Sequence, residues 1–298
     1  MTREDIEFPG ECGVTLRGWF YPADGDTTSG ATVVMAHGLS SVKEMYLDEY
    51  ARVFSQAGLN VVVYDHRNFG SSDGTPRQEV DPVLQYRDYR NAITFAGTRP
   101  EVDGARIGIW GSSFSGGHVL TVASIDRRVK AVVAQVPFVS GSGVLQRAVR
   151  PDFIPHTRAL FDVDRLQRFD GGEPTMVPVI TPDPTSLAVM PSTDAHEWFA
   201  QTWRRAPAWR NEITARSMEL VTEYEPTSYI SGIAPTPLLM IVAADDAVAP
   251  VALALEAFER AREPKRIIVA PGGHFDLYAG PGFDLCAAAA CIHFREHL

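Results

Sequence analysis

The stretch IGIWGSSFSGG, residues 107–117, begins as a β-branched apolar run and ends in small residues, a pattern typical of a buried strand that turns sharply into a helix. A serine on such a turn needs small residues two positions before and two positions after it, because strand and helix approach closely there. Ser113 meets this condition, with Gly111 before it and Ser115 after it. We therefore predict that Ser113 is a nucleophile on a strand-to-helix elbow.

Two other serines in this stretch are alternatives. Ser112 would have Trp110 and Phe114 at the flanking positions, where large side chains should clash. Ser115 has small neighbours, but it lies further from the strand and should fall within the first helical turn. Ser115 also stands where the G-x-S-x-G motif has its final glycine, so the motif is a variant. A glycine-rich packing turn without chemistry is the simpler alternative.

Alternating strand and helix patterns surround this stretch and indicate βαβ units on a mostly parallel sheet flanked by helices. The strand-like runs are apolar on both faces, as buried parallel strands are. We expect strands near residues 31–36, 60–64, 106–110, 129–136, 237–244 and 266–270, and helices near residues 42–58, 81–97, 115–124, 251–261 and 283–298. The segment VTLRGWFYP, residues 14–22, alternates more openly and predicts an antiparallel edge strand or hairpin.

The alternation stops within residues 138–232, which are rich in Pro, Arg and aromatic residues. The part GGEPTMVPVITPDP, residues 171–184, can form neither a helix nor a central strand, because its prolines lack the N–H groups that these elements require. We predict an α/β core formed by residues 1–137 and 233–298, and a cap formed by residues 138–232. The cap should lie over the strand ends, because open α/β sheets bind ligands at their carboxyl edge.

Composition and charge argue against several classes of protein. The 298 residues are 45% hydrophobic and 21% charged, as in a soluble globular protein. The net charge of −10 would repel a nucleic-acid backbone, so we expect no nucleic-acid partner. No apolar run is long enough to cross a membrane and the N-terminus does not resemble a signal peptide, so we expect a cytoplasmic protein. Three cysteines without CxxC spacing favour neither a disulfide framework nor a zinc cluster.

A serine nucleophile needs a base that removes its proton and a carboxylate that orients the base, and at this kind of elbow the chain order is Ser, Asp, His. The run LLMIVAADDAVAP, residues 238–250, is a strand that ends in two aspartates. Asp246 lies four residues before Pro250, so we prefer it to Asp245, although an aspartate pair is also a common turn. His274 follows the next strand in a glycine-rich loop, from which a base can reach the elbow.

Other histidines are less well placed for this role. His118 should lie in the helix after the elbow and pack there. His293 and His297 share one face of the last helix, but a metal site would need a further ligand, and the glutamate of an H-E-x-x-H motif is missing. We therefore expect neither a metal nor a cofactor.

An acyl-transfer site also needs two N–H donors for the developing oxyanion. The amide of Phe114, the residue after the nucleophile, should be one donor. The loop MAHGLSS, residues 35–41, should supply the other from Leu39, which follows a His-Gly turn at a strand end. We expect His37 to order this loop and to take no part in the chemistry.

The chain resembles the serine α/β-hydrolases, and within them the dienelactone-hydrolase-like branch that includes fungal polyketide transferases and thiohydrolases. The similar stretches are SSVKEMYLDEY (40–50), YDHRNFGSSDGTPRQEVDP (64–82) and WGSSFSGG (110–117). The resemblance covers most of the chain and implies an α/β-hydrolase fold, the triad Ser113, Asp246 and His274, and ester or thioester substrates. Dienelactone hydrolases themselves use a cysteine nucleophile, so a serine at this position indicates a different activity.

We predict a hydrolase that cleaves carboxylic esters, thioesters or lactones of small to medium apolar substrates through an acyl-enzyme. An acyltransferase that uses the same triad and a non-water acceptor is one alternative, and a non-catalytic binding protein is another. In the predicted cap, Trp198, Trp203 and Trp209 are candidate substrate-binding residues, or they pack the cap against the core. The expected partner is a small ester-type molecule. The apolar C-terminal helix could also form a homodimer face, although a core position is preferred.

Overall fold

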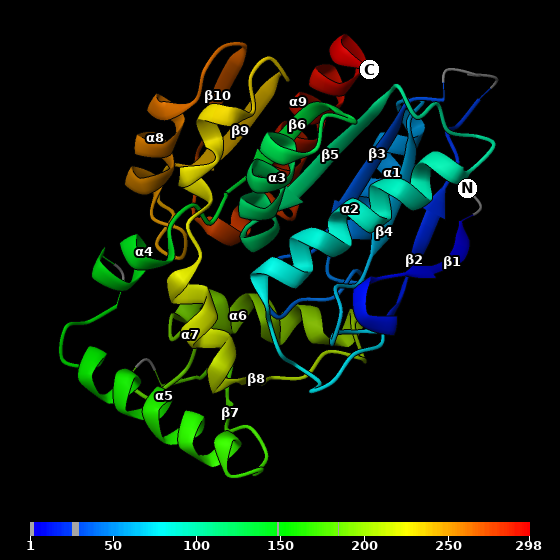
Figure 1. The fold of residues 1–298 in the computed structure, drawn as a ribbon. Helices are drawn as coiled ribbons and strands as arrows, with labels where there is room; N and C mark the ends of the chain where they lie inside the picture. Colours follow the sequence, from blue (N-terminus) through cyan, green and yellow to red (C-terminus); the bar gives the residue numbers. More distant parts are fainter. Residues whose placement is uncertain (1–2, 26–29, 148, 184) are drawn as a thin grey trace.

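The computed structural model describes residues 3–25, 30–147, 149–183 and 185–298, which form an eight-stranded, mostly parallel sheet (Figure 1). The strand order is β1-β2-β4-β3-β5-β6-β9-β10. The strands are β1 (Glu4–Pro9), β2 (Thr15–Tyr21), β3 (Thr32–Ala36), β4 (Asn60–Tyr64), β5 (Ile107–Ser112), β6 (Val129–Gln135), β9 (Leu238–Ala243) and β10 (Lys265–Ala270). β1 and β2 form an antiparallel hairpin whose second strand pairs antiparallel with β4, and the other neighbours are parallel. The structure therefore confirms the predicted fold class.

Helices cover both faces of the sheet, because each buried strand points alternate side chains to opposite faces. In β3, Val34 packs into the apolar cluster beneath α2 (Pro82–Thr98), α3 (Phe114–Ile125) and α8 (Val251–Arg260). Its neighbour Val33 packs into the cluster beneath α1 (Leu47–Gln56) and α9 (Gly280–His297). Figure 1 shows α2 and α3 on the opposite side of the sheet from α9.

Helix α1 begins later than the sequence predicts. The pattern at residues 42–58 becomes helical only at Leu47, because Tyr46 has the left-handed value φ 66° and interrupts the helix. In contrast, α2 begins as its sequence predicts. The side chain of Asp81 accepts hydrogen bonds from the amides of Val83 and Leu84, and proline occupies the first helical position.

Between β6 and β9 the chain forms a separate group of short elements, which Figure 1 shows gathered at one end of the sheet. They are α4 (Gly141–Arg147), α5 (Ile154–Phe169), β7 (Met176–Val177), α6 (Thr193–Thr202), β8 (Ile213–Thr214) and α7 (Ala215–Glu223). A third apolar cluster joins this inserted segment to loops that follow the strands, with Phe199 and Ile213 on one side and Val42 and Phe114 on the other. The division into core and cap stays a prediction, and residues 1–2, 26–29, 148 and 184 of those ranges lie outside the described part.

The C-terminal helix α9 packs one side against the sheet. Cys286, Ala290 and Phe294 are buried, whereas Leu285 and Ile292 are exposed. The predicted core position is therefore found for one face of the helix, and the homodimer stays a prediction. Among the described residues, no helix combines the length and the apolar character that crossing a bilayer requires.

Candidate active site

Ser113 occupies the sharp turn between β5 and α3. Its backbone angles are φ 57° and ψ −119°, a strained conformation for a residue other than glycine. Strand and helix approach so closely that a Cβ atom at Gly111 would overlap the carbonyl of Ser115. The turn lifts the Ser113 side chain into a half-exposed position at the carboxyl end of the strand.

His274 lies in hydrogen-bond contact with both Ser113 and Asp246. The distance from His274 Nε2 to Ser113 Oγ is 3.0 Å, and that from His274 Nδ1 to Asp246 Oδ2 is 2.7 Å. Asp246 is buried, and its other oxygen accepts the amides of Val248 at 2.9 Å and Ala249 at 2.7 Å. A carboxylate can only accept, so Nδ1 carries the imidazole proton and Nε2 accepts the hydroxyl proton of Ser113.

The alternatives to these three residues are placed elsewhere. Asp245 is exposed, and its amide donates to the carbonyl of Gly272. His118 is buried in α3 as predicted, where its ring contacts the hydroxyl of Tyr224 at 2.9 Å and the side-chain oxygen of Gln85 at 3.1 Å. Burial lowers the pKa of His118 to about 3, which keeps this imidazole neutral.

The loop after β3 lies against the nucleophile. A Cβ atom at Gly38 would stand 3.0 Å from the Cβ atom of Ser113, so only glycine allows this approach without displacement. The amides of Leu39 and Phe114 donate no hydrogen bond to any residue that the structure describes. Both amides are therefore free to bind an anionic oxygen beside Ser113.

His37 orders this loop. Its Nδ1–H donates to the carbonyl of Gly38 at 2.9 Å, and its Nε2 accepts the amide of His66 at 3.0 Å. Burial lowers the pKa of His37, so the ring stays neutral.

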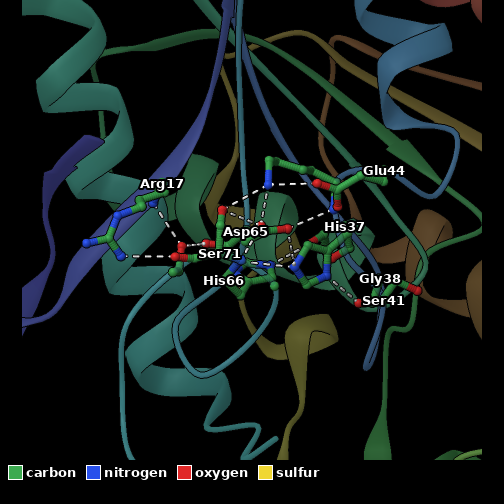
Figure 2. A network of polar contacts seen from close by, with 12 residues as sticks. Arg17, His37, Gly38, Ser41, Glu44, Asp65, His66 and Ser71 are labelled. Carbon is green, nitrogen blue, oxygen red and sulfur yellow. Dashed lines mark hydrogen bonds and ion pairs between the residues drawn. The ribbon is translucent and has the colours of Figure 1, made fainter. Parts of the chain in front are cut away.

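A buried ion pair fixes the next part of the same loop (Figure 2). Lys43 Nζ lies 2.6 Å from one oxygen of Asp65, and the amide of Lys43 donates to the other at 2.8 Å. The amide and the hydroxyl of Ser71 also donate to Asp65. Burial disfavours the charge of Asp65, but the ammonium and the amide of Lys43 hold the pKa of its carboxyl below the ordinary value.

An apolar cavity of 580 Å³ lies beside this site. Ala247 and Val248 in its wall directly follow Asp246, and the amide of Phe138, also in the wall, donates to the carbonyl of Ser113 at 2.9 Å. Most of the remaining wall comes from the inserted segment. Its apolar members include Val144, Leu145, Val149, Phe153, Phe161, Leu187, Val189, Met190, Ile213, Met218 and Val221.

The three tryptophans predicted to bind substrate are not among the residues that line this cavity. Trp203 is 51% exposed, because it follows α6 on the outer surface. Trp209 stacks on Phe199 with ring centroids 5.1 Å apart. Trp198 is half-buried and stacks on Phe275, the neighbour of His274, with centroids 5.0 Å apart. Trp198 thus packs the insertion against the core, which is one of the two roles predicted for the tryptophans, and their role in substrate binding stays a prediction.

The residues that line the cavity are not predicted by the sequence pattern. Helix α4 contributes Gly141, Val144 and Leu145, and its sequence GSGVLQR gave only a weak apolar pattern. Phe138 could have been found, because it follows the carboxyl end of β6 three residues after Gln135. Within the described ranges, no group of three or more His, Cys, Asp or Glu side chains has the arrangement of a metal site.

A serine on a strand-to-helix elbow, followed along the chain by an aspartate and a histidine that meet it at one edge of a mostly parallel sheet, is the arrangement of the α/β-hydrolases. Comparison with known proteins agrees with this class. Residues 33–284 match the model of the alpha/beta hydrolase family. The chain belongs to the alpha/beta hydrolase family.

Curated relatives and solved structures span all or nearly all of the chain. A thiohydrolase from Eupenicillium brefeldianum is 31% identical over 290 residues, which cover 96% of this chain and 91% of the relative. A polyketide transferase from Aspergillus fumigatus is also 31% identical, over 300 residues that cover 100% of this chain and 99% of the relative. The crystal structure of the alpha/beta hydrolase GrgF from a Penicillium species superposes with a TM-score of 0.86 at 28% identity, covering 100% of this chain and 99% of that one.

Proposed function

We propose that this protein is a serine hydrolase that cleaves carboxylic esters or thioesters of small to medium apolar substrates through an acyl-enzyme on Ser113. One observation carries the proposal. The imidazole of His274 lies 3.0 Å from Ser113 Oγ and 2.7 Å from Asp246 Oδ2, so the hydroxyl has a base and the base has an orienting carboxylate.

In the proposed mechanism, His274 Nε2 accepts the hydroxyl proton while Ser113 Oγ attacks the substrate carbonyl. The amides of Leu39 and Phe114 bind the oxyanion of the tetrahedral intermediate, and Asp246 stabilises the imidazolium. The intermediate collapses to an acyl-serine as His274 protonates the departing alcohol or thiol. Water, deprotonated by the same imidazole, then attacks the acyl-serine and releases the acid, and the proton returns to Ser113.

The substrate class is inferred from the cavity beside the site. An apolar pocket of 580 Å³ that begins next to Asp246 favours an apolar acyl or alcohol group of moderate size. The name of one relative, a thiohydrolase, supports thioesters among the substrates.

An acyltransferase that uses the same three residues and a non-water acceptor is the second candidate. It is favoured by the similarity to a protein named polyketide transferase over the full length of the chain. In that reaction a hydroxyl or amine of the acceptor takes the place of water in the second step, and the product is a new ester or amide.

A panel of p-nitrophenyl esters and matched acyl thioesters, from two to twelve carbons, tests the proposed function. We expect turnover by the wild-type protein and none by the Ser113→Ala variant. Equal rates for the two proteins would reject the proposal. Product analysis with and without an added alcohol then separates the two candidates, since a hydrolase releases only the acid, whereas a transferase forms the new ester in proportion to the alcohol.

A further inference from the structure

The two serines beside the proposed nucleophile are each bonded to a different loop of the site. Ser112 and Ser115 are completely buried, so neither can reach a substrate. We propose that both are positioning residues: Ser115 holds the loop that carries the oxyanion donor Leu39, and Ser112 holds the loop that carries the base His274. This inference rests on the proposed function.

Ser115 closes a ring of contacts around His37. Its hydroxyl donates to the carbonyl of His37 at 2.6 Å. A hydroxyl has one proton, so the contact of 2.9 Å between Ser115 Oγ and His66 Nε2 is a bond that the imidazole donates. The amide of His66 in turn donates to His37 Nε2. The first turn of α3 and the loop after β4 thus fix His37 on its backbone and on its ring, two residues before Leu39.

Ser112 makes a corresponding hydrogen bond to the loop that carries His274. Its hydroxyl lies 2.6 Å from the hydroxyl of Tyr278, four residues after His274. The residue before Tyr278 is held as well, because the hydroxyl of Tyr50 donates to the carbonyl of Leu277 at 2.6 Å. These bonds fix the far end of the short helical turn that begins at His274.

The hydrogen bond of Ser115 explains why the motif departs from G-x-S-x-G at its last position. A glycine at position 115 would satisfy the close approach of strand and helix, but it would leave the carbonyl of His37 without its hydroxyl donor. An unpaired carbonyl of this kind would favour movement of the loop. Burial keeps the pKa of His66 well below its ordinary value, so its neutral ring can donate from Nε2 throughout the neutral range.

Measuring the hydrogen exchange of both loops in each of the Ser115→Ala and Ser112→Ala variants tests this inference. Ser55→Ala is the matched control, because Ser55 is also completely buried and donates one hydrogen bond to a main-chain carbonyl, that of Pro22. Hydrogen–deuterium exchange reports on the two loops without any need for activity. We expect roughly tenfold faster exchange within residues 37–46 for Ser115→Ala and within residues 272–279 for Ser112→Ala, with the opposite loop unchanged in each variant.

Kinetics on the best p-nitrophenyl ester give the second readout. Misplacing a catalytic group lowers the rate without weakening substrate binding, so kcat should fall roughly 10- to 100-fold while KM stays within about twofold. Ser55→Ala should match the wild type in kcat, KM and exchange of both loops. If either serine variant fails to fold, Ser115→Gly and Tyr278→Phe remove the same hydrogen bonds.

Two outcomes would overturn the inference. One is that Ser112→Ala and Ser115→Ala match Ser55→Ala in both kcat and exchange. The other is that each variant loosens both loops equally, since these hydrogen bonds would then be general packing. Failure of the proposed function has a different signature: the wild type would be inactive toward every ester and thioester, yet the crossed exchange pattern would still show which serine holds which loop.

Discussion

The loops at the strand ends and the inserted segment between β6 and β9 are held in place by different kinds of interaction. Ser113, Asp246 and His274 follow strands whose register is set by main-chain hydrogen bonds, and their side chains meet within 3.0 Å. The inserted segment is held mostly through side chains instead: an apolar cluster and ion pairs such as Arg205 to Asp48 and Arg216 to Glu79. On its helix α5, Val163 is 59% exposed and Phe169 is 88% exposed, although the same helix also lines the cavity.

This difference separates the residues that determine turnover from the residues that determine substrate preference. The register of the sheet fixes the positions at the strand ends, and proton transfer requires such fixed geometry. Positions in the insertion need only enclose an apolar group, so their side chains tolerate exchange if the volume is kept. Substitutions in the first region should therefore abolish turnover of every substrate, and substitutions in the second should change which substrates are used.

The largest effect is expected for Ser113→Ala. Loss of the nucleophile should lower kcat roughly 10⁴- to 10⁶-fold, because only the oxyanion donors and substrate binding remain. Since Ser113 has a strained backbone and a half-exposed side chain, the melting temperature should not fall. Esterase assays and thermal unfolding measure the two quantities, and a variant that is inactive because it is unfolded would show no melting transition.

A smaller effect is expected for Asp246→Asn. An amide in this place can donate to His274 Nδ1 and so stabilise the imidazole tautomer that cannot accept the Ser113 proton, which should lower kcat roughly 10⁴-fold. The neighbouring Asp245→Asn is the matched control, because Asp245 is exposed. If the two variants lose equal activity, Asp246 is not the orienting carboxylate.

The sequence predicted the first region far better than the second. The ends of strands can be predicted because apolar runs stop there. The topology of the sheet then brings Ser113, Asp246 and His274 to one edge of that sheet. The cavity wall has no such pattern, since it depends on how short helices pack on one another. Trp203 is an example. An aromatic residue of this type suits a pocket wall, but the packing of α6 leaves its ring exposed.

The bonds of Ser112 and Ser115 were unpredictable for a related reason. Ser112 meets Tyr278, which is 166 residues away in the sequence, and Ser115 meets His37, 78 residues away. A serine also has several ordinary roles in turns and helix caps, so its type alone indicates no partner.

A change of preference is expected for Val144→Phe in the cavity wall. The larger ring would fill part of the pocket, so kcat/KM for a ten-carbon ester should fall roughly tenfold or more relative to the acetate ester. Val163→Phe is the matched control, because Val163 is exposed on the outer side of the insertion. The measurement is kcat/KM on the ester series. An equal loss of kcat/KM at every chain length would place Val144 outside the acyl pocket.

A further effect concerns stability in acid and leaves turnover aside. Burial lowers the pKa of His118 to about 3 in the folded protein, against 6.5 as the ordinary value. The unfolded chain therefore binds a proton at this residue below pH 6.5 and the folded chain does not, so stability is lost as the pH falls, by about 1.4 kcal/mol per pH unit from this residue.

Urea unfolding between pH 7 and pH 4 measures this loss. The His118→Gln variant should show a slope of unfolding free energy against pH that is shallower by that amount, and His156→Gln, an exposed position on α5, should leave the slope unchanged. Equal slopes for wild type and His118→Gln would mean that His118 is protonated in the folded state.

Of Ser112, Ser113 and Ser115, we propose that only Ser113 is a nucleophile activated by His274. Labelling the wild-type protein with a fluorophosphonate probe, followed by peptide mass spectrometry, tests it most directly, because the probe bonds covalently only to an activated hydroxyl. We expect one adduct per chain, on Ser113, that is absent from the Ser113→Ala variant. An unlabelled wild-type protein, or an adduct on Ser112 or Ser115, would contradict it.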